Sequence, residues 1–329
     1  MNRSGPFALK ITILALEGVF DTGLTVLLDA FATANDLGTL LLDTSPHFDV
    51  STVGMRTPVH TARGLEVPVL PVACQTRPDW VIIPALNTRM PEELVKSLGR
   101  SDMLDAKQQL LTWHEEGAGI AASCIGTFLL AETGLLAGHE ATTSWWLGPF
   151  FRQRYPEILL DESRMLVPAS RLVTAGAAMG HLDLALWIIR KFSPELATLV
   201  ARYMLADYRS QQAPYIIPEH LAHSDPLIEN FERWARSQLS VGFSLQDAAK
   251  ALATTPRTLQ RRTEAVLGKS PLAFFQDMRV ERAQHLVRTT NMDIEAIASQ
   301  VGYVDGATLR TLLRRRLGRG VRELRADLR

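Results

Sequence analysis

Cysteine is scarce in this sequence: Cys74 and Cys124 are the two that its 329 residues contain. Two cysteines exclude the disulfide framework of a small secreted domain, and no Cys/His spacing typical of a zinc site accompanies them. Long apolar runs are missing too, since no stretch approaches the roughly 18 apolar residues of a membrane helix, and residues 11–16 are too short for a signal-peptide core. We therefore expect a cytoplasmic protein without membrane segment, metal or cofactor.

Net charge is also absent, because 35 Lys and Arg balance 35 Asp and Glu. The balance conceals a division of the chain. From Ser244 onward 16 basic residues stand against 9 acidic ones, a net charge of +7, whereas the preceding residues carry 19 and 26, a net charge of −7. A basic end behind an acidic body favours a nucleic-acid-binding module joined to a different domain.

One helix-turn-helix pattern occurs twice in the basic part. Apolar residues spaced to bury one helical face recur 49 residues later, and the offset becomes 50 after one added residue in the second turn. A small residue at each tight corner lets two short helices cross closely. The first set is Leu245, Ala248, Ala249, Leu252 and Ala253, and the second is Ile294, Ile297, Ala298, Val301 and Gly302.

The second helix of each pair carries polar side chains outward, and Thr255 with Pro256 marks the start of the first such helix. Arg and Gln can pair with guanine or adenine edges in the major groove. A solvated charged face is the alternative, but charge alone does not bring a duplicated apolar register. The expected DNA contacts are Arg257, Thr258, Gln260, Arg261 and Arg262 on the first helix and Ala307, Arg310, Thr311, Arg314 and Arg315 on the second.

The chain before residue 205 alternates between predicted strands and helices. A hairpin is predicted between residues 166 and 174. The alternation indicates a parallel sheet covered on both faces, hence a flavodoxin-like α/β sandwich followed by an all-α domain with two helix-turn-helix units. The strands are expected over 8–16, 48–55, 79–86 and 119–123, and the helices over 22–37, 91–116 (one broken or two), 126–136, 182–192 and 194–205.

A connector between the two domains is predicted where Gln, His and Pro gather, over residues 208–226. We expect a first domain over 8–205, a linker over 206–224 and a DNA-binding domain over 225–329. His220 and His223 have the spacing of a metal pair, but no third ligand lies near them in the sequence.

Cys124 stands where a short buried strand is predicted to turn at once into a helix. The small residues Ala122 and Gly126 fit the sharp turn of a nucleophile elbow, which lifts the central side chain above the carboxyl end of the sheet. A helix N-terminus beneath the sulfur would favour the thiolate. An inert buried cysteine is the alternative, and it fits the same spacing.

Four motifs together carry a resemblance to a known family: residues 122–138, beginning Ala-Ser-Cys-Ile-Gly, residues 141–146, 257–262 and 301–306. The first domain resembles the ThiJ/PfpI branch of the class I glutamine-amidotransferase-like fold. The second resembles the AraC/XylS DNA-binding domain. The combination is similar to the GlxA-type transcriptional regulators over nearly the whole chain.

The resemblance implies that Cys124 holds the position of the family cysteine and Asp21 that of the acidic residue facing it in the enzymes. Ser144 stands where the family commonly has histidine, and Ile125 interrupts the Cys-His dipeptide of its peptidase-like members. Without an imidazole, no general base stands beside the thiol. The expected effector-pocket residues are Asp21, Cys124, Ile125, Ser144, Trp145 and Gly176, with Trp145 and Trp146 either facing a cationic effector or packing in the core.

The second domain departs from the AraC pattern at two positions. Thr311 stands where arginine is usual, which leaves Arg310 and Arg314 as substitutes for base reading by the second helix. Thr263 replaces a phenylalanine at a packing position.

The sequence thus predicts a homodimeric transcriptional regulator whose first domain binds a small polar or cationic metabolite and whose second domain binds double-stranded promoter DNA. Two alternatives remain open. One is a cysteine-dependent hydrolase or amidase with a DNA-binding tail, and the other is a first domain that only dimerises. The missing imidazole favours a protein that is not an enzyme.

Overall fold

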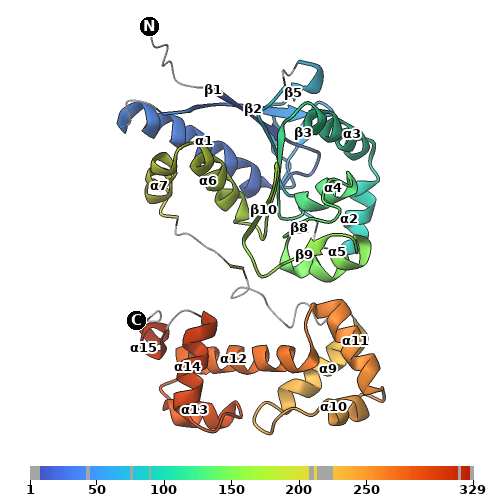
Figure 1. Ribbon diagram of the computed structural model, residues 1–329, viewed down its shortest axis with the longest axis vertical. Coiled ribbons are helices and arrows are strands. Elements are labelled where there is room, and N and C mark those ends of the chain that lie inside the picture. The colour runs from blue at the N-terminus through green and yellow to red at the C-terminus, as the bar shows by residue number, and fades with distance from the viewer. Residues whose placement is uncertain are drawn as a thin grey trace. The chain divides into compact units, whose positions relative to one another are not determined.

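The computed structural model describes residues 8–41, 45–74, 77–88, 90–206, 211–212, 225–317 and 320–326. The chain divides into two compact units, Met1–Ala213 and Pro214–Arg329 (Figure 1). His220 and His223 lie outside the described residues. Within the described ranges, no group of three or more His, Cys, Asp and Glu is placed to hold a metal ion. No helix in this part of the chain combines the length and the apolarity needed to cross a membrane.

The first unit is built on a seven-stranded sheet in the order β10-β11-β7-β6-β1-β2-β5. Neighbouring strands are parallel except β10 and β11, which form the predicted hairpin at one edge. Two short ladders, β3–β4 and β8–β9, lie outside this sheet. The strands are β1 Ala8–Leu14, β2 His47–Gly54, β3 Val59–His60, β4 Glu66–Val67, β5 Leu70–Pro71, β6 Trp80–Ile83, β7 Gly119–Ser123, β8 Glu140–Ala141, β9 Leu159–Leu160, β10 Leu166–Ala169 and β11 Leu172–Ala175.

Helices cover both faces of the sheet, as the alternating sequence predicts (Figure 1). One layer consists of α1 (Asp21–Leu41), α6 (Gly180–Phe192) and α7 (Pro194–Tyr203). The other consists of α2 (Pro91–Leu98), α3 (Ser101–Glu115), α4 (Gly126–Glu132) and α5 (Gly148–Arg154), with the 3-10 turns η1 (Val72–Cys74) and η2 (Trp145–Leu147). Of the two possibilities predicted for residues 91–116, one broken helix or two consecutive helices, the structure has the second.

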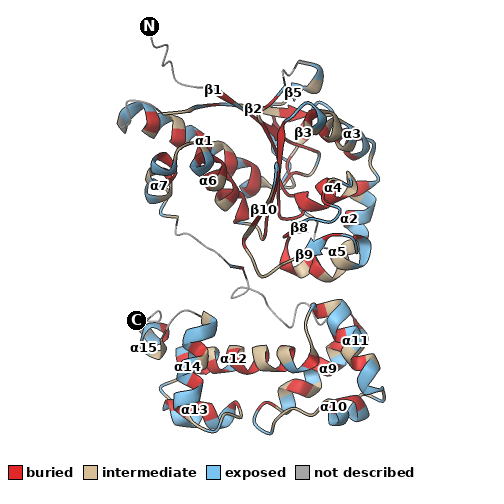
Figure 2. Cartoon of the chain, viewed as in Figure 1, coloured by how far each residue is buried: buried red, intermediate tan, exposed pale blue. Residues whose placement is uncertain are grey.

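The central strands have unbroken apolar sequences because both of their faces are covered. In β6, Val81 and Ile83 enter one apolar cluster, whereas Trp80 and Ile82 enter the other. This alternation is the consequence of the two-residue period of a strand. Figure 2 shows the buried residues gathered on the strands and on the inward faces of the helices.

The second unit is all helical, and its long helix α12 lies between two groups of shorter helices (Figure 1). Helices α9 to α11 form the first half and α13 to α15 the second half. Helix starts follow the sequence signals: the side chains of Ser244, Thr255, Ser270 and Asp293 accept backbone N–H groups. The helices are α9 Pro226–Ser237, α10 Leu245–Ala251, α11 Pro256–Leu267, α12 Pro271–Thr289, α13 Ile294–Gln300, α14 Gly306–Leu317 and α15 Val321–Ala326.

The two helix-turn-helix corners are left-handed, with φ 49° at Ala253 and φ 74° at Gly302. Side chains are disfavoured in this conformation because Cβ approaches the carbonyl oxygen. A Cβ on Gly302 would also overlap the guanidinium of Arg279 and the carbonyl oxygen of Leu239. The left-handed backbone thus favours small residues at both corners, and the packing around Gly302 admits only glycine.

Candidate functional site

Cys124 lies in a sharp turn between β7 and α4, with φ 56°. Gly126 follows because a Cβ there would overlap the carbonyl oxygens of Ile83 and Pro84 at the end of β6. The turn is therefore pressed against the neighbouring strand. Its backbone has the strained strand-to-helix form that the sequence predicts.

The thiol of Cys124 is enclosed, with 3% of the residue exposed, and its sulfur lies 2.7 Å from the hydroxyl oxygen of Ser144. Burial raises the pKa of Cys124 to about 11, although the hydrogen bond with Ser144 acts in the opposite direction. A backbone hydrogen bond from Ile125, at the start of α4, also favours the thiolate, in the direction that the sequence predicts. Desolvation of the charged form outweighs it, and the thiol stays protonated at neutral pH.

The other predicted pocket residues of the first unit have separate surroundings. Asp21 is the first residue of α1, and its buried Oδ1 has no hydrogen-bond partner within the described part of the chain. Ile125 is buried and borders an apolar void of about 10 Å³, which is too small for a metabolite. Trp145 is buried and meets Trp146 edge-on at 5.5 Å between ring centroids, so core packing accounts for it.

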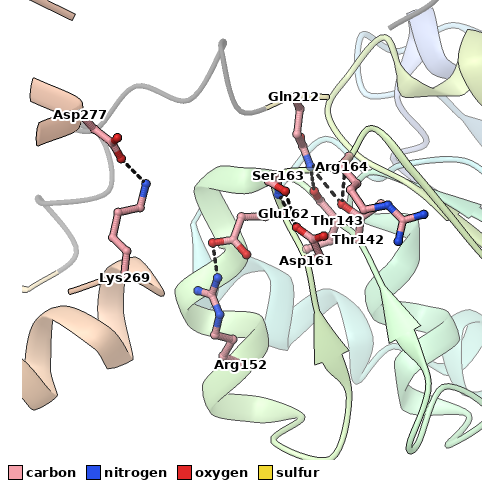
Figure 3. A network of polar contacts seen from close by, with 10 residues as sticks. All are labelled: Thr142, Thr143, Arg152, Asp161, Glu162, Ser163, Arg164, Gln212, Lys269 and Asp277. Carbon is pink, nitrogen blue, oxygen red and sulfur yellow. Dashed lines mark hydrogen bonds and ion pairs between the residues drawn. The ribbon is translucent and has the colours of Figure 1, made fainter. Parts of the chain in front are cut away.

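Gln212 lies within the range 206–224 that was expected to be linker, yet it is fully buried in the first unit. Its Nε2 donates to Thr142 Oγ1 at 3.0 Å and to the carbonyl oxygens of Thr143 and Arg164 at 2.9 and 3.3 Å (Figure 3). A Cβ on Gly176 would overlap this side-chain amide, so the glycine leaves the space that Gln212 fills. Gly176 is therefore covered by the Gln212 side chain and does not line an open pocket.

The residues 142–144 join Gln212 to the cysteine turn. Thr143 Oγ1 donates to the carbonyl oxygen of Cys124 at 2.7 Å, and Ser144 contacts its sulfur. Gln212 holds the other side of this strip through Thr142 and Thr143. The last described residue of the first unit is thus two hydrogen bonds away from Cys124.

His181 is a buried imidazole that sequence reasoning missed. Its Nε2 accepts the backbone N–H of Ala85 at 3.0 Å, and its Nδ1 lies 2.6 Å from the carbonyl oxygen of Ala178. Burial lowers the pKa of His181 to about 4, although the bond to Ala178 opposes the shift. A Cβ on Gly23 would lie 2.6 Å from the ring. The imidazole is neutral, and both nitrogens are engaged, so it is not a free base for Cys124.

An open hollow of about 420 Å³ lies at the carboxyl ends of β1 and β2. Its lining combines apolar Leu16 and Met55 with charged Glu17, Arg56 and Arg100. Sequence reasoning missed this site. Ligands of α/β sheets bind at the carboxyl ends of strands, so Glu17 and Arg56, which directly follow the two predicted strands, were the signal that could have located it.

Charges of both signs are paired around the hollow. Arg56 contacts Asp105 at 2.5 Å, and Arg100 contacts Asp102 at 2.7 Å. Although burial by itself would raise it, the pKa of Asp102 is lowered by the hydrogen bond and charge of Arg100. The hollow therefore offers a carboxylate, guanidinium groups and an apolar wall to a small molecule.

On α11, the predicted DNA contacts divide into free and engaged side chains. Arg257 and Arg261 are exposed one turn apart, and Thr258 accepts a hydrogen bond from the capping residue Thr255. The amide of Gln260 donates to Glu264 on the same helix. Arg262 forms an ion pair with Asp225 at the start of α9. Arg257 and Arg261 therefore have no hydrogen-bond or ion-pair partner within the described residues.

On α14, exposed Ala307, Thr311 and Arg315 follow one line at four-residue spacing. The Thr311 hydroxyl donates its one hydrogen to the carbonyl oxygen of Ala307. Arg310 and Arg314 lie apart from this line and border a hollow shared with α15. The two helices thus present different side chains outward, despite their common origin in the repeat.

Residues 248–327 match a family model described as a helix-turn-helix domain. The regulator GbdR of Pseudomonas aeruginosa, a helix-turn-helix transcriptional regulator, is 24% identical over 193 residues, which are 57% of this chain and 52% of the relative. The chain thus spans about half the length of this curated relative.

Two solved structures share the fold of the first unit. One, from Vibrio parahaemolyticus and described as a candidate transcriptional regulator, covers 60% of this chain and 99% of its own, with 19% identity and a TM-score of 0.51. The other, a ThiJ/PfpI family protein from Pseudomonas syringae, covers 76% and 92%, with 16% identity and a TM-score of 0.50. The predicted α/β fold and the predicted helix-turn-helix domain are both confirmed.

Proposed function

From a chain that joins a ThiJ/PfpI-like α/β domain to an AraC-type helix-turn-helix domain, we propose a sequence-specific DNA-binding transcriptional regulator controlled by a small molecule. The observation that carries this proposal is the duplicated helix-turn-helix unit around α12, within the region that matches the helix-turn-helix model. Two such units can enter successive major grooves on one face of a duplex. Promoter DNA would be the partner, and the protein would act in the cytoplasm, where bacterial promoters lie.

The first domain would supply the effector site. The hollow beside Glu17 and Arg56 is open as it stands, whereas Cys124 and Ser144 are buried and become accessible only if their turn moves. Paired charges over an apolar wall suit a small polar or zwitterionic metabolite. We propose this hollow as the first place to look for effector binding.

Catalysis by Cys124 is the second candidate, and the surroundings of the thiol argue against it. A nucleophilic cysteine needs a lowered pKa or an adjacent base, but burial raises the pKa of Cys124 to about 11. Ser144 is its hydrogen-bond partner, and the imidazole of His181 is engaged on both sides. We propose that the protein turns over no substrate and that it acts as a homodimer.

Selection of duplexes from a random library by the full-length protein tests DNA binding. We expect recovery of a shared sequence that is bound more tightly than random DNA at the same salt concentration. Equal binding of all duplexes would contradict sequence-specific regulation. Sedimentation velocity in the same buffer tests the homodimer.

Thermal shift measurements with a panel of small amino acids and quaternary ammonium compounds test the effector site. A ligand that binds only the folded state raises the unfolding temperature. Arg56→Ala should remove that shift, whereas Arg63→Ala, which changes an exposed arginine outside the hollow, should keep it. Loss of the shift in both variants, or in neither, would speak against the hollow.

A further inference from the structure

The two outward helices, α11 and α14, belong to different halves of the second unit. The first half packs on one part of α12 and the second half on another, and no direct pairing of α11 with α14 is needed for either fold. A single helix between two modules bends and twists. Side-chain contacts that reach from one half to the other would therefore decide how constant their separation is.

Arg279, near the middle of α12, makes such a contact. Only 8% of this residue is exposed. Its Nε donates to the carbonyl oxygen of Leu239, which follows α9 in the first half, at 2.9 Å. Its guanidinium lies over the ring of Phe275 at 4.7 Å and over that of Tyr303, in the corner of the second half, at 5.4 Å. One buried cation thus touches both halves.

The corner of the second half is shaped around this contact. A Cβ on Gly302 would overlap both the guanidinium of Arg279 and the carbonyl oxygen of Leu239. The hydroxyl of Tyr303 donates to Gln276 on α12 at 2.8 Å, which fixes the ring beside Arg279. Because so little of Arg279 is exposed, DNA cannot be its partner.

Asp277 makes a second contact between the halves. One of its carboxylate oxygens accepts from Lys269, which follows α11, at 2.8 Å (Figure 3). The other lies 3.4 Å from the guanidinium of Arg316 on α14. Asp277 and Arg279 are two positions apart on α12, so their side chains leave the helix in different directions. The halves are therefore joined on two sides of the helix.

We infer that Arg279 and Asp277 are positioning residues that fix the separation of α11 and α14, and so make the number of base pairs between two half-sites a determinant of DNA specificity. The inference rests on the proposed DNA-binding function. Adding one base pair turns the second half-site by about 35° and moves it by about 3.4 Å. A rigid protein cannot follow this change, whereas a loosened one can.

The test uses the full-length protein and duplexes selected by the wild type. One base pair is added to or removed from the segment between the two protected half-sites, and the dissociation constants for the original and altered duplexes are compared. Because each ratio compares two duplexes bound by the same protein preparation, a general loss of active protein does not change it. We expect a wild-type ratio of at least about tenfold, since one helix loses its base contacts. Arg279→Met should lower the ratio to about threefold or less.

Two further variants keep the test decisive. Asp277→Asn loosens the second contact without opening the core, and it should also lower the ratio. Arg282→Met, which changes an exposed arginine on the same helix, should keep the wild-type ratio. An unchanged ratio in Arg279→Met and Asp277→Asn would overturn this inference and leave the proposed DNA-binding function intact. If the wild type selects no duplex, the proposed function fails, and the inference falls with it.

Discussion

The side-chain amide of Gln212 fills the space that the missing side chain of Gly176 leaves. The two residues are separated by a long stretch of sequence, yet a Cβ at position 176 would overlap the Gln212 amide. Three acceptors on residues 142, 143 and 164 surround the same amide nitrogen. The end of the first unit is therefore attached to the strip that borders Cys124, which makes this pair a stability determinant.

We predict that Gln212→Ala lowers the free energy of unfolding of the first unit by about 1–3 kcal/mol, because buried carbonyl oxygens lose their donor. Gly176→Ala should have a similar cost, since it displaces the same amide. The double variant should cost less than the sum, as expected for residues in contact. Urea denaturation measures all three, and Gln211→Ala, at an exposed neighbour, is the control. Additive effects would contradict the pairing.

The thiol of Cys124 should react slowly with iodoacetamide at neutral pH. Its pKa of about 11, against a reference of 9.0, leaves about 100-fold less thiolate than an unperturbed cysteine has. The rate, measured in a Cys74→Ser background, should rise with pH up to about pH 10 without a plateau. A plateau near pH 7 would show a stabilised thiolate instead.

Acid should destabilise the first unit through His181. The pKa of this imidazole falls from 6.5 to about 4 on folding, so the unfolded chain binds the proton more readily. Its contribution to stability is complete above pH 6.5 and is lost as the pH falls toward 4, by about 3 kcal/mol in total. The pKa of Asp102 is also lowered on folding, but its contribution to stability is lost only at a pH below the range in which His181 titrates.

The free energy of unfolding measured between pH 7 and pH 4 checks this expectation. His181→Gln removes the titrating group and should show a shallower decline over the same range. Equal slopes in the two proteins would mean that other groups titrate there.

Arg262 and Arg257 should behave differently although both were predicted to contact DNA. Arg262→Ala leaves the buried carboxylate of Asp225 without its ion pair and should destabilise the second unit by about 1–2 kcal/mol. Arg257→Ala should leave stability unchanged and weaken binding of the selected duplex by about 1–3 kcal/mol. Thermal denaturation and titration of specific and random duplexes separate the two effects. Equal losses on both duplexes for Arg257→Ala would reduce this residue to a phosphate contact.

The fold was predictable where the cause is local. Apolar periodicity located the longer strands and helices, but not the short strands β3, β4, β5, β8 and β9 or helix α5. The small residues at Ala253 and Gly302 located the corners, because a left-handed backbone restricts the side chain at that position itself. The turn at Cys124 was predictable for the same reason. Each of these features depends on residues within a few positions of one another.

The site was less predictable where the cause is distant. The pKa of Cys124 depends on burial by several elements, which a helix N-terminus in the sequence does not reveal. Arg262 pairs with a residue 37 positions away, and Gln212 lies in a Pro-rich polar stretch that has the composition of a linker. Arg279 has the sequence neighbours of an ordinary surface arginine, so only the packing of both halves identifies it.

The two corners of the repeat should tolerate mutation unequally, although they arose from one pattern. At Ala253 a methyl group already occupies the left-handed backbone, so glycine would relieve about 1 kcal/mol of strain there. At Gly302 the space belongs to Arg279 and Leu239, and even a methyl group would displace them. The first corner therefore accepts either alanine or glycine, whereas the second accepts glycine alone, because its backbone is also part of the contact that joins the two halves.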